Sequence, residues 1–219
     1  MKPIVIKLGG SLAETGRLRS WLSLVARARR PVVIVPGGGP LADAVRALQR
    51  ELRFGDAAAH EMAILAMQQM GLAMIALEQR LVAAETLLAI TRAARGRRVP
   101  VWLPAKLCAA DRQIPKSWSI TSDGLAARLA ERLGSEVVLL KSRKVAAAAT
   151  PKALVRDGIV DPAFAAIVER SALSWRIFGP GEERTLAALL DASPSEPPRK
   201  PASKRRALLS TRQSPHGRA

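Results

Sequence analysis

The sequence predicts an α/β protein, a three-layer αβα sandwich with a mainly parallel central sheet. Short apolar runs alternate with helical patterns along most of the chain. The runs are continuously apolar, as in strands that are buried on both faces of a parallel sheet. Two of them end in glycine-rich turns that open helices, and ligands bind at such strand ends in α/β sheets.

The expected elements follow one another in a regular order. Strands are expected at 3–8, 32–35, 99–103, 136–140 and 174–178. Helices are expected where apolar residues recur every three or four positions, at 18–26, 40–52, 56–79, 85–95, 121–133, 164–170 and 182–190. Pro40 suits the first turn of its helix, Asp56 is a candidate N-cap, and Gly134 suits a helix end.

Composition narrows the class of protein. The chain has 219 residues, 48% of them hydrophobic, which is enough for one sizeable core. Cys108 is the only cysteine, which excludes an intramolecular disulfide and fits a reducing compartment. No signal-peptide pattern and no spanning apolar segment is present. We therefore expect a cytoplasmic protein without a membrane span.

The formal net charge of +17 raises the question of nucleic-acid binding. Much of the excess lies at the end of the chain, so 1–191 is expected to fold as one domain and 192–219 to form a disordered basic tail. Aromatic residues make up 3% of the chain, which leaves few platforms for base stacking. The basicity therefore favours small anionic ligands, with nucleic-acid binding through the tail as a minor alternative.

Glycine turns follow the first two predicted strands. They consist of Gly9, Gly10 and Ser11 in the first turn and Gly37, Gly38 and Gly39 in the second. Backbone N–H groups and a helix dipole converge on an anion at such turns, so the pair predicts two phosphates that face each other. Lys7, which precedes the first turn, places an ammonium where phosphoryl charge develops.

Two other glycine motifs fit less well. Neither turn matches G-x-x-x-x-G-K-[ST]. The G-x-G-x-x-A match at 37–42 lacks the acidic residue expected at the end of the next strand.

Three motifs resemble the signatures of the amino acid kinase superfamily: KLGGS at 7–11, VPGGG at 35–39 and TSDGLAARLA at 121–130. The resemblance covers residues 1 to about 191 and implies phosphoryl transfer with ATP and Mg²⁺. It implies that Lys7 stabilises the transferring phosphoryl group, that the first turn holds the nucleotide phosphates and that the second binds the acceptor. Asp123 would orient the catalytic lysines and contact the metal.

The chain departs from this family in two places. Val145, Ala146 and Ala147 stand where members commonly carry Val-Asp-Gly, and the turn at 157–162 lacks a second catalytic lysine. Lys141, Lys144 and Lys152 are candidates to replace that lysine in space. Lys141 and Lys144 are also expected to bind the nucleotide.

The segment GDAAAHEMAILAMQQMG at 55–71 indicates the acceptor. It carries His60 near a helix start, and its methionines suit an adaptable apolar wall. With PGGGPLADAVR and SWSITSD, it is similar to the branch of this family that phosphorylates an aminomethylfuran-methyl phosphate in methanofuran-type cofactor biosynthesis. This resemblance implies an acceptor that already carries a phosphate, with His60 beside it and Asp161 or Asp43 paired with its ammonium.

Two other functions stay open. One is a nucleotide kinase like the uridylate kinases, which also take a phosphorylated acceptor. The other is a non-catalytic protein that binds a nucleotide or an oxyanion on the same fold, which the two departures favour. The Met- and Ala-rich helix at 57–77 is a candidate dimer face, so we expect a homo-oligomer.

Overall fold

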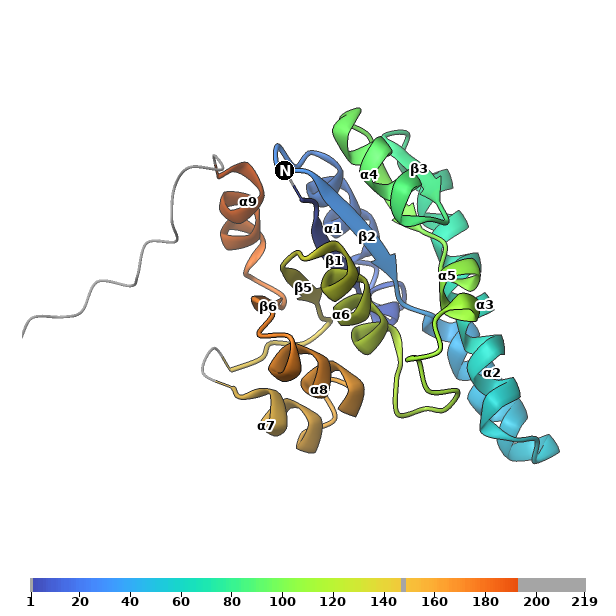
Figure 1. Ribbon diagram of the computed structural model, residues 1–219. Helices are drawn as coiled ribbons and strands as arrows, with labels where there is room; N and C mark the ends of the chain where they lie inside the picture. Colours follow the sequence, from blue (N-terminus) through green and yellow to red (C-terminus); the bar gives the residue numbers. More distant parts are fainter. Residues whose placement is uncertain (1, 147–148, 193–219) are drawn as a thin grey trace, which may run out of the picture.

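Figure 1 shows the computed structural model, which describes residues 2–146 and 149–192. Its sheet has six strands in the order β3-β4-β2-β1-β5-β6, all parallel to their neighbours. The strands are β1 (Ile4–Leu8), β2 (Val32–Pro36), β3 (Leu81–Ala84), β4 (Val99–Trp102), β5 (Val137–Leu140) and β6 (Trp175–Phe178). The predicted fold class is confirmed. The basic tail expected from 192 onward lies outside the described residues, apart from Ala192.

Helices lie on both faces of the sheet. They are η1 (Gly10–Leu12), α1 (Leu18–Ala26), α2 (Gly39–Leu52), α3 (Asp56–Leu77), α4 (Leu87–Arg95), α5 (Ala105–Ala110), α6 (Ser122–Leu133), α7 (Pro151–Arg156), α8 (Pro162–Arg170) and α9 (Glu183–Asp191). Helices α1 and α9 share one core cluster with the sheet, and α4 to α8 share the other. Helix α3 contributes to both, through Met67 and Met74.

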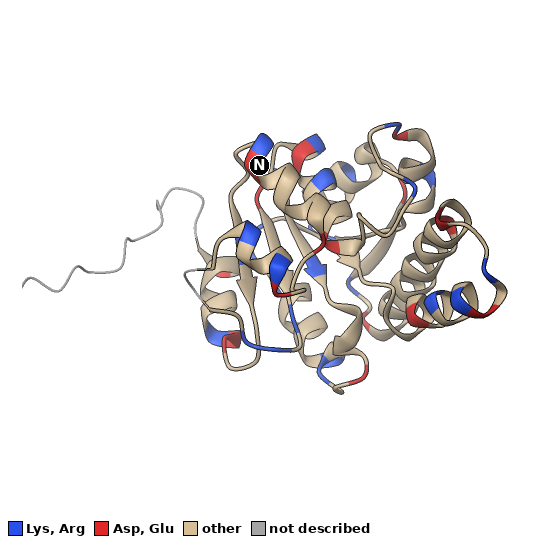
Figure 2. Cartoon of the chain, turned by 90° about the horizontal axis from the view of Figure 1, so that it is seen from below, with Lys and Arg blue, Asp and Glu red and all other residues tan. Residues whose placement is uncertain are grey.

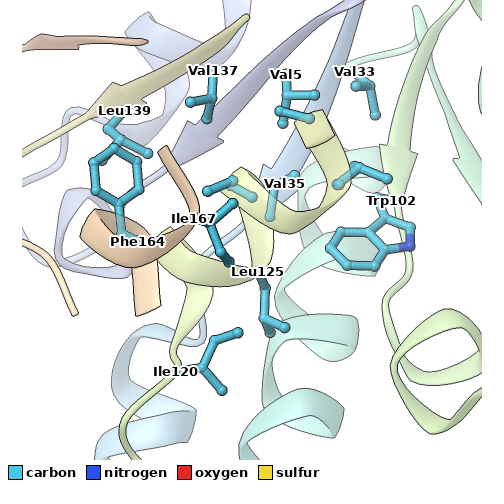
Figure 3. Packing of buried hydrophobic residues seen from close by; sticks show 14 of the residues in the cluster. Val5, Val33, Val35, Trp102, Ile120, Leu125, Val137, Leu139, Phe164 and Ile167 are labelled. Atoms are coloured by element: carbon cyan, nitrogen blue, oxygen red, sulfur yellow. The ribbon is translucent and has the colours of Figure 1, made fainter. Parts of the chain in front are cut away.

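Side chains along β1 alternate between these two clusters. Ile4, Ile6 and Leu8 pack toward α1, whereas Val5 packs toward α6. Figure 3 shows Val5 facing the helical layer that carries Phe164 and Leu125. Because alternate residues of a strand point to the same face, Lys7 follows Val5 and points toward α6 at the end of the strand.

The structure adds elements that the sequence did not predict. Strand β3, helices α5 and α7, and the short helix η1 are absent from the predicted order. Strand β3 has four residues, LVAA, which are too few to show an apolar period. Among the described strands it pairs with β4 alone. The prediction of five strands is therefore wrong by one edge strand.

Helix α3 also differs from the prediction in detail. Gly55 occupies its N-cap, so the prediction of Asp56 as the cap is wrong. Asp56 is the first helical residue, and its carboxylate instead accepts a hydrogen bond of 2.8 Å from Gln49 on α2. The helix ends at Leu77, two residues before the predicted end. In the part of the chain that the structure describes, neither this helix nor another is long and apolar enough to span a bilayer.

Candidate active site

The two glycine turns lie side by side at the carboxyl end of the sheet. Strands β1 and β2 are neighbours in register, with Leu8 opposite Pro36, so both turns leave the same edge. A Cβ atom on Gly10 would lie 2.2 Å from the backbone nitrogen of Gly39, and one on Gly37 would lie 2.4 Å from that of Gly10. The two backbones therefore touch, which leaves no room for a side chain at either position.

A buried cluster of three charges stands beside the first turn. Lys7 Nζ lies 2.9 Å from Asp123 Oδ1, and Lys141 Nζ donates a 2.6 Å hydrogen bond to Asp123 Oδ2. Lys141 also donates to the carbonyl oxygen of Ile159 at 2.6 Å. The side chains of Lys7, Asp123 and Lys141 are only 6%, 7% and 13% exposed. We call these three residues the charge cluster.

The elements of the fold explain how the cluster forms. Lys7 stands near the end of β1, Lys141 directly follows β5, and Asp123 lies in the first turn of α6. Strands β1 and β5 are neighbours, so both lysines reach the same edge of the sheet. The positive end of the α6 dipole adds to the stabilisation of the Asp123 carboxylate.

The charges within the cluster shift one another's protonation. Burial by itself raises the pKa of Asp123, but the charges of Lys7 and Lys141 outweigh it and hold this pKa below its ordinary value. Burial, followed by repulsion from Lys7, lowers the pKa of Lys141 to about 8. At neutral pH the cluster therefore holds a carboxylate between two ammonium groups, and its net charge is positive.

Lys7 and Lys141 use their protons differently. Both N–H bonds that Lys141 commits are directed at Asp123 and Ile159. Lys7 contacts Asp123 Oδ1 at 2.9 Å as an ion pair, and no other described side chain engages its ammonium. Its Nζ lies 3.8 Å from the position of a Cβ on Gly9, so the ammonium stands next to the first turn. Lys7 can therefore donate hydrogen bonds to an anion held by that turn.

Helix α6 is anchored at its far end by a second set of charges. Arg128 makes a two-pronged contact with Asp111, at 2.8 and 3.1 Å. Glu131 bonds to Arg128, to Ser171 and, at 2.9 Å, to Arg170, which ties α6 to α8. These contacts fix the helix that carries Asp123.

Asp161, predicted to bind the acceptor, is committed to the fold. One carboxylate oxygen caps α8 by accepting from the Phe164 N–H at 2.9 Å. The other accepts from the Thr121 N–H at 3.0 Å, the Thr121 hydroxyl at 2.7 Å and the Gly124 N–H at 2.9 Å. With these four bonds Asp161 holds the start of α6 in place. The geometry therefore assigns Asp161 a positioning task, away from the cavity that the glycine turns line.

That cavity has a volume of about 240 Å³ and opens between the two turns, α3 and the start of α6. Its lining includes Gly10, Ser11, Gly38 and Gly39 from the turns, Asp43 and Arg46 from α2, His60, Ile64 and Met67 from α3, and Trp118, Thr121 and Ser122 before and within α6. The inner wall is apolar, and hydroxyl, imidazole and backbone groups lie around it. His60, predicted to contact the acceptor, lies here and is 4% exposed.

Protonation of His60 follows from this burial. Burial lowers the pKa of His60 below its ordinary value, so the imidazole is neutral at pH 7 and offers one donor and one acceptor. Asp43, the alternative carboxylate of the sequence analysis, lines the same cavity.

Arg46 and Trp118 form a wall of the cavity that the sequence analysis missed. The Arg46 guanidinium lies 4.3 Å from the ring centroid of Trp118 and 2.9 Å from an oxygen of Asp43. Trp118 Nε1 donates to Gln49 at 2.7 Å, which fixes the ring. Arg46 lies one turn after Asp43 on α2, and this spacing was the available signal.

Gly10 and Ser11, predicted to bind the nucleotide, line this same cavity, whereas Lys144 lies on the loop after β5. The hydroxyl groups of Ser11 and Ser142 are 2.9 Å apart, which joins the first turn to the loop after β5. Lys144 is exposed on the same loop, with its Nζ 3.9 Å from the position of a Cβ on Gly181, after β6. Lys141, also predicted to bind the nucleotide, is instead buried in the charge cluster.

Asp123 does not fit a magnesium ion as the structure stands. Its Oδ2 accepts from Lys141, and its Oδ1 faces Lys7 at 2.9 Å. Mg²⁺ in kinases is usually bound by one or two carboxylates together with substrate phosphates and water, and here both oxygens of Asp123 face lysines. The predicted contact between Asp123 and a metal therefore has no support in the donor set.

Comparison with known proteins identifies the family. A model of the amino acid kinase family matches residues 2–144, more than half of the chain. The chain belongs to the amino acid kinase family. The resemblance drawn from the three motifs is thereby confirmed.

Two individual proteins are also similar to this family member. The [5-(aminomethyl)furan-3-yl]methyl phosphate kinase of Methanocaldococcus jannaschii is 28% identical over 138 residues, which cover 62% of this chain and 63% of the relative. The chain thus matches less than two thirds of that relative's length. The uridylate kinase of Archaeoglobus fulgidus has the same fold, with a TM-score of 0.63 at 19% identity over 87% of this chain and 95% of that one.

Proposed function

We propose that the protein is an ATP-dependent kinase whose acceptor is a small phosphate ester, the aminomethylfuran-methyl phosphate of methanofuran-type cofactor biosynthesis. The observation that carries the proposal is the charge cluster, which stands beside two touching glycine turns. The N–H groups of Gly9 and Gly37 already donate to the carbonyl oxygens of Leu140 and Leu8, so those of Gly10, Ser11, Gly38 and Gly39 would bind the two phosphates. Membership of the amino acid kinase family and the name of the Methanocaldococcus relative support it.

The charge cluster suits phosphoryl transfer because this reaction depends on positioning and charge stabilisation. Lys7 donates to the oxygen atoms of the transferring group, where negative charge is concentrated in the transition state. Lys141 supplies the second ammonium that the turn at 157–162 lacks, and it does so from the end of β5. Asp123 holds both lysines, and Asp161 holds the helix that carries Asp123.

ATP and Mg²⁺ belong to this proposal through the first turn. Gly9, Gly10 and Ser11 would hold the nucleotide phosphates, with Lys144 nearby on the loop after β5. The magnesium ion supplies charge neutralisation to the phosphates when it is bound. This ion would be carried by the phosphates and water, since Asp123 is committed to the lysines.

The cavity favours a small acceptor over a nucleotide. Its volume of about 240 Å³ lies below the roughly 300–1,000 Å³ of pockets that bury drug-sized ligands. The acceptor phosphate would lie on the turn at 37–39, with the neutral His60 as a donor. Asp43 would pair with the ammonium of the acceptor, in place of Arg46, at the open side of the cavity.

The decisive experiment measures ADP formed from ATP and Mg²⁺ with aminomethylfuran-methyl phosphate, and the diphosphate product by mass spectrometry. We expect turnover in the wild type and a loss of roughly two to three orders of magnitude in Lys7→Ala. Lys106→Ala is the matched control, because Lys106 is exposed on α5 and its loss leaves the cavity intact. Full turnover in Lys7→Ala would remove the role of this lysine.

The departure at 145–147 favours a second candidate, a protein that binds a nucleotide without transferring phosphate. Calorimetry with ATP, followed by the same assay with uridine monophosphate and the furan phosphate, separates the two. Binding without product for either acceptor supports the second candidate, and product from uridine monophosphate alone supports a uridylate-type kinase. A cytoplasmic location and a homo-oligomer through α3 stay predictions.

A further inference from the structure

The outer part of the cavity beside the glycine turns holds two charged side chains from α2. Asp43 and Arg46 line it, and the other described lining residues are uncharged at pH 7, including the neutral His60. Figure 2 shows α2 and α3 as a helix pair at the right, with acidic and basic residues gathered on α2. The contacts of these two side chains show which charge this part of the cavity favours.

Arg46 lies between two groups that attract a cation. Its guanidinium is 4.3 Å from the ring centroid of Trp118 and donates a 2.9 Å hydrogen bond to Asp43 Oδ1. The face of an indole ring carries partial negative charge, and the carboxylate carries a full one. Asp43 and Trp118 therefore offer two attractive contacts to a single positively charged group, and we call these two residues the cation subsite.

Trp118 is a fixed part of this subsite, whereas Arg46 is held weakly. Trp118 Nε1 donates to Gln49 at 2.7 Å, and Gln49 donates in turn to Asp56 at 2.8 Å, which ties the ring to α2 and to the start of α3. The side chains of Arg46 and Asp43 are 40% and 64% exposed, and ion pairs at exposed positions are weak. A ligand can therefore displace the guanidinium without moving the ring.

The position of the subsite along α2 sets its distance from the second glycine turn. Helix α2 begins at Gly39, where backbone N–H groups and the helix dipole favour an anion. Asp43 and Arg46 follow four and seven residues later, which corresponds to about 6 and about 10 Å along the helix axis. The cavity therefore offers an anion and a cation position at this separation. A phosphate ester with an amine at the other end of a short body spans it.

We propose that Asp43 and Trp118 recognise a primary ammonium group on the acceptor, and that Arg46 occupies their subsite as a competing cation built into the chain. The inference rests on the proposed function, because it takes the acceptor phosphate to lie on the turn at 37–39. It adds the indole face as a second contact of the ammonium, and Arg46 as a residue that weakens acceptor binding. Binding of an anionic part of the acceptor by Arg46 is the opposite assignment, and the test includes it as an outcome.

The test measures the binding of two pairs of phosphate esters by calorimetry without ATP. The first pair is aminomethylfuran-methyl phosphate and its analogue with ethyl in place of aminomethyl. The second pair is 4-aminobutyl phosphate and pentyl phosphate. Within a pair the end group is either an ammonium or a methyl group, so the ratio of the two Kd values measures recognition of the charge. We expect the wild type to prefer the cationic members by about fivefold.

Substitution of Arg46 gives the result with the most distinctive sign. Arg46→Met removes the competing cation, so the Kd of the cationic members should fall by about tenfold while that of the neutral members stays within about twofold. Arg50→Met is the matched control, because Arg50 is an exposed arginine on the same helix and does not line the cavity. This control should leave the Kd values of both pairs at those of the wild type.

Two further variants test the subsite itself. Asp43→Asn and Trp118→Leu should each reduce the preference for the cationic members to about twofold or less, because each removes one of the two attractive contacts. Trp118→Leu also removes the hydrogen bond to Gln49. A distorted cavity would weaken both members of a pair and leave their ratio unchanged, so the ratio separates recognition of the charge from damage to the fold.

Four outcomes overturn the inference. They are no binding of any of the four esters by the wild type, no preference for the cationic member of either pair, an unchanged preference in Asp43→Asn or Trp118→Leu, and weaker binding of both members of a pair by Arg46→Met. The last result would show that Arg46 binds an anionic part of the acceptor. ATP and turnover enter none of these measurements, and the second pair contains no furan, so the kinase proposal stands or fails separately.

Discussion

Positive charge is arranged in opposite ways at the two ends of the parallel strands, which we call the carboxyl edge and the amino edge of the sheet. At the carboxyl edge, Lys7 and Lys141 are buried and share the carboxylate of Asp123. At the amino edge, Arg95 and Arg97 are exposed and have no acidic partner among the described residues. A buried charge is tolerated only when the fold compensates it, whereas an exposed charge keeps its water until a ligand replaces that water. The carboxyl edge is therefore preorganised, and the amino edge is open.

The largest effect is expected from breaking the compensation at the carboxyl edge. Asp123→Asn keeps the shape of the side chain and leaves two buried ammonium groups without a counter-charge. We expect the free energy of unfolding, measured with urea, to fall by about 3–5 kcal/mol at pH 7. Asp157→Asn is the control, because it breaks only the exposed pair with Arg156, which is worth about 1 kcal/mol or less.

The pH dependence of Asp123→Asn checks the cause. The pKa of Asp123 is lowered in the folded protein, so its contribution is complete above the unfolded pKa of about 4 and is lost as the pH falls through the folded pKa. The difference between wild type and variant should narrow in acid. A difference that stays constant down to pH 2 would contradict the electrostatic explanation.

A smaller effect is expected when Lys141 loses its proton as the pH rises above about 8. This loss should raise the free energy of unfolding relative to a variant without the lysine and should lower turnover. Its folded pKa of about 8 lies below its unfolded value, so the unfolded chain binds more protons between about pH 8 and 10.4. The free energy of unfolding should rise across that window in the wild type relative to Lys141→Met. Turnover should fall by up to about tenfold per pH unit above 8, as the second ammonium is lost.

Two measurements check this prediction. Urea titrations at pH 7.5, 8.5 and 9.5 compare the wild type with Lys141→Met, and the pH profile of kcat compares the wild type with Lys141→Arg, which stays charged. A descending limb at the same pH in Lys141→Arg would show that another group causes it.

The smallest effect is expected at the amino edge. The variant with Gln at 29, 95 and 97 loses repulsion between these side chains and the favourable contact of Arg95 with the α4 dipole. These two small effects have opposite signs, so its free energy of unfolding should match that of the wild type within about 0.5 kcal/mol. Any gain should appear at 0.01 M salt and disappear at 1 M, where the screening length is about 3 Å. A loss of more than 1 kcal/mol would mean that these arginines have a structural role.

Local signals and long-range pairing differ in how much of the fold could be predicted from the sequence. The apolar strands and their glycine turns are local signals, so the parallel sheet and the neighbouring turns could be predicted. Strand β3 could not, because LVAA is short, half alanine and attached by one neighbour only. Its position is decided by its pairing with β4, which no local pattern records.

The residues of the candidate site also differ in whether a local motif or a long-range strand pairing places them. Lys7 and Asp123 lie in recognisable motifs, whereas Lys141 reaches Asp123 only because β5 lies next to β1. Asp161, one of the two carboxylates predicted to pair with the acceptor, accepts four hydrogen bonds that cap α8 and hold the start of α6, which no local pattern indicated. A sequence pattern can show that a carboxylate is buried, but the atoms that satisfy it come from distant parts of the chain.

The contact between Gly10 and Gly39 has a consequence for how such an enzyme could be altered. Because the two main chains touch, no side chain can be placed between the glycine turns, so in the proposed kinase the backbone alone would set the distance between the two phosphate sites. Substitutions of Arg46 and Trp118, in the outer wall of the cavity, would therefore change which acceptor binds and leave that distance unchanged.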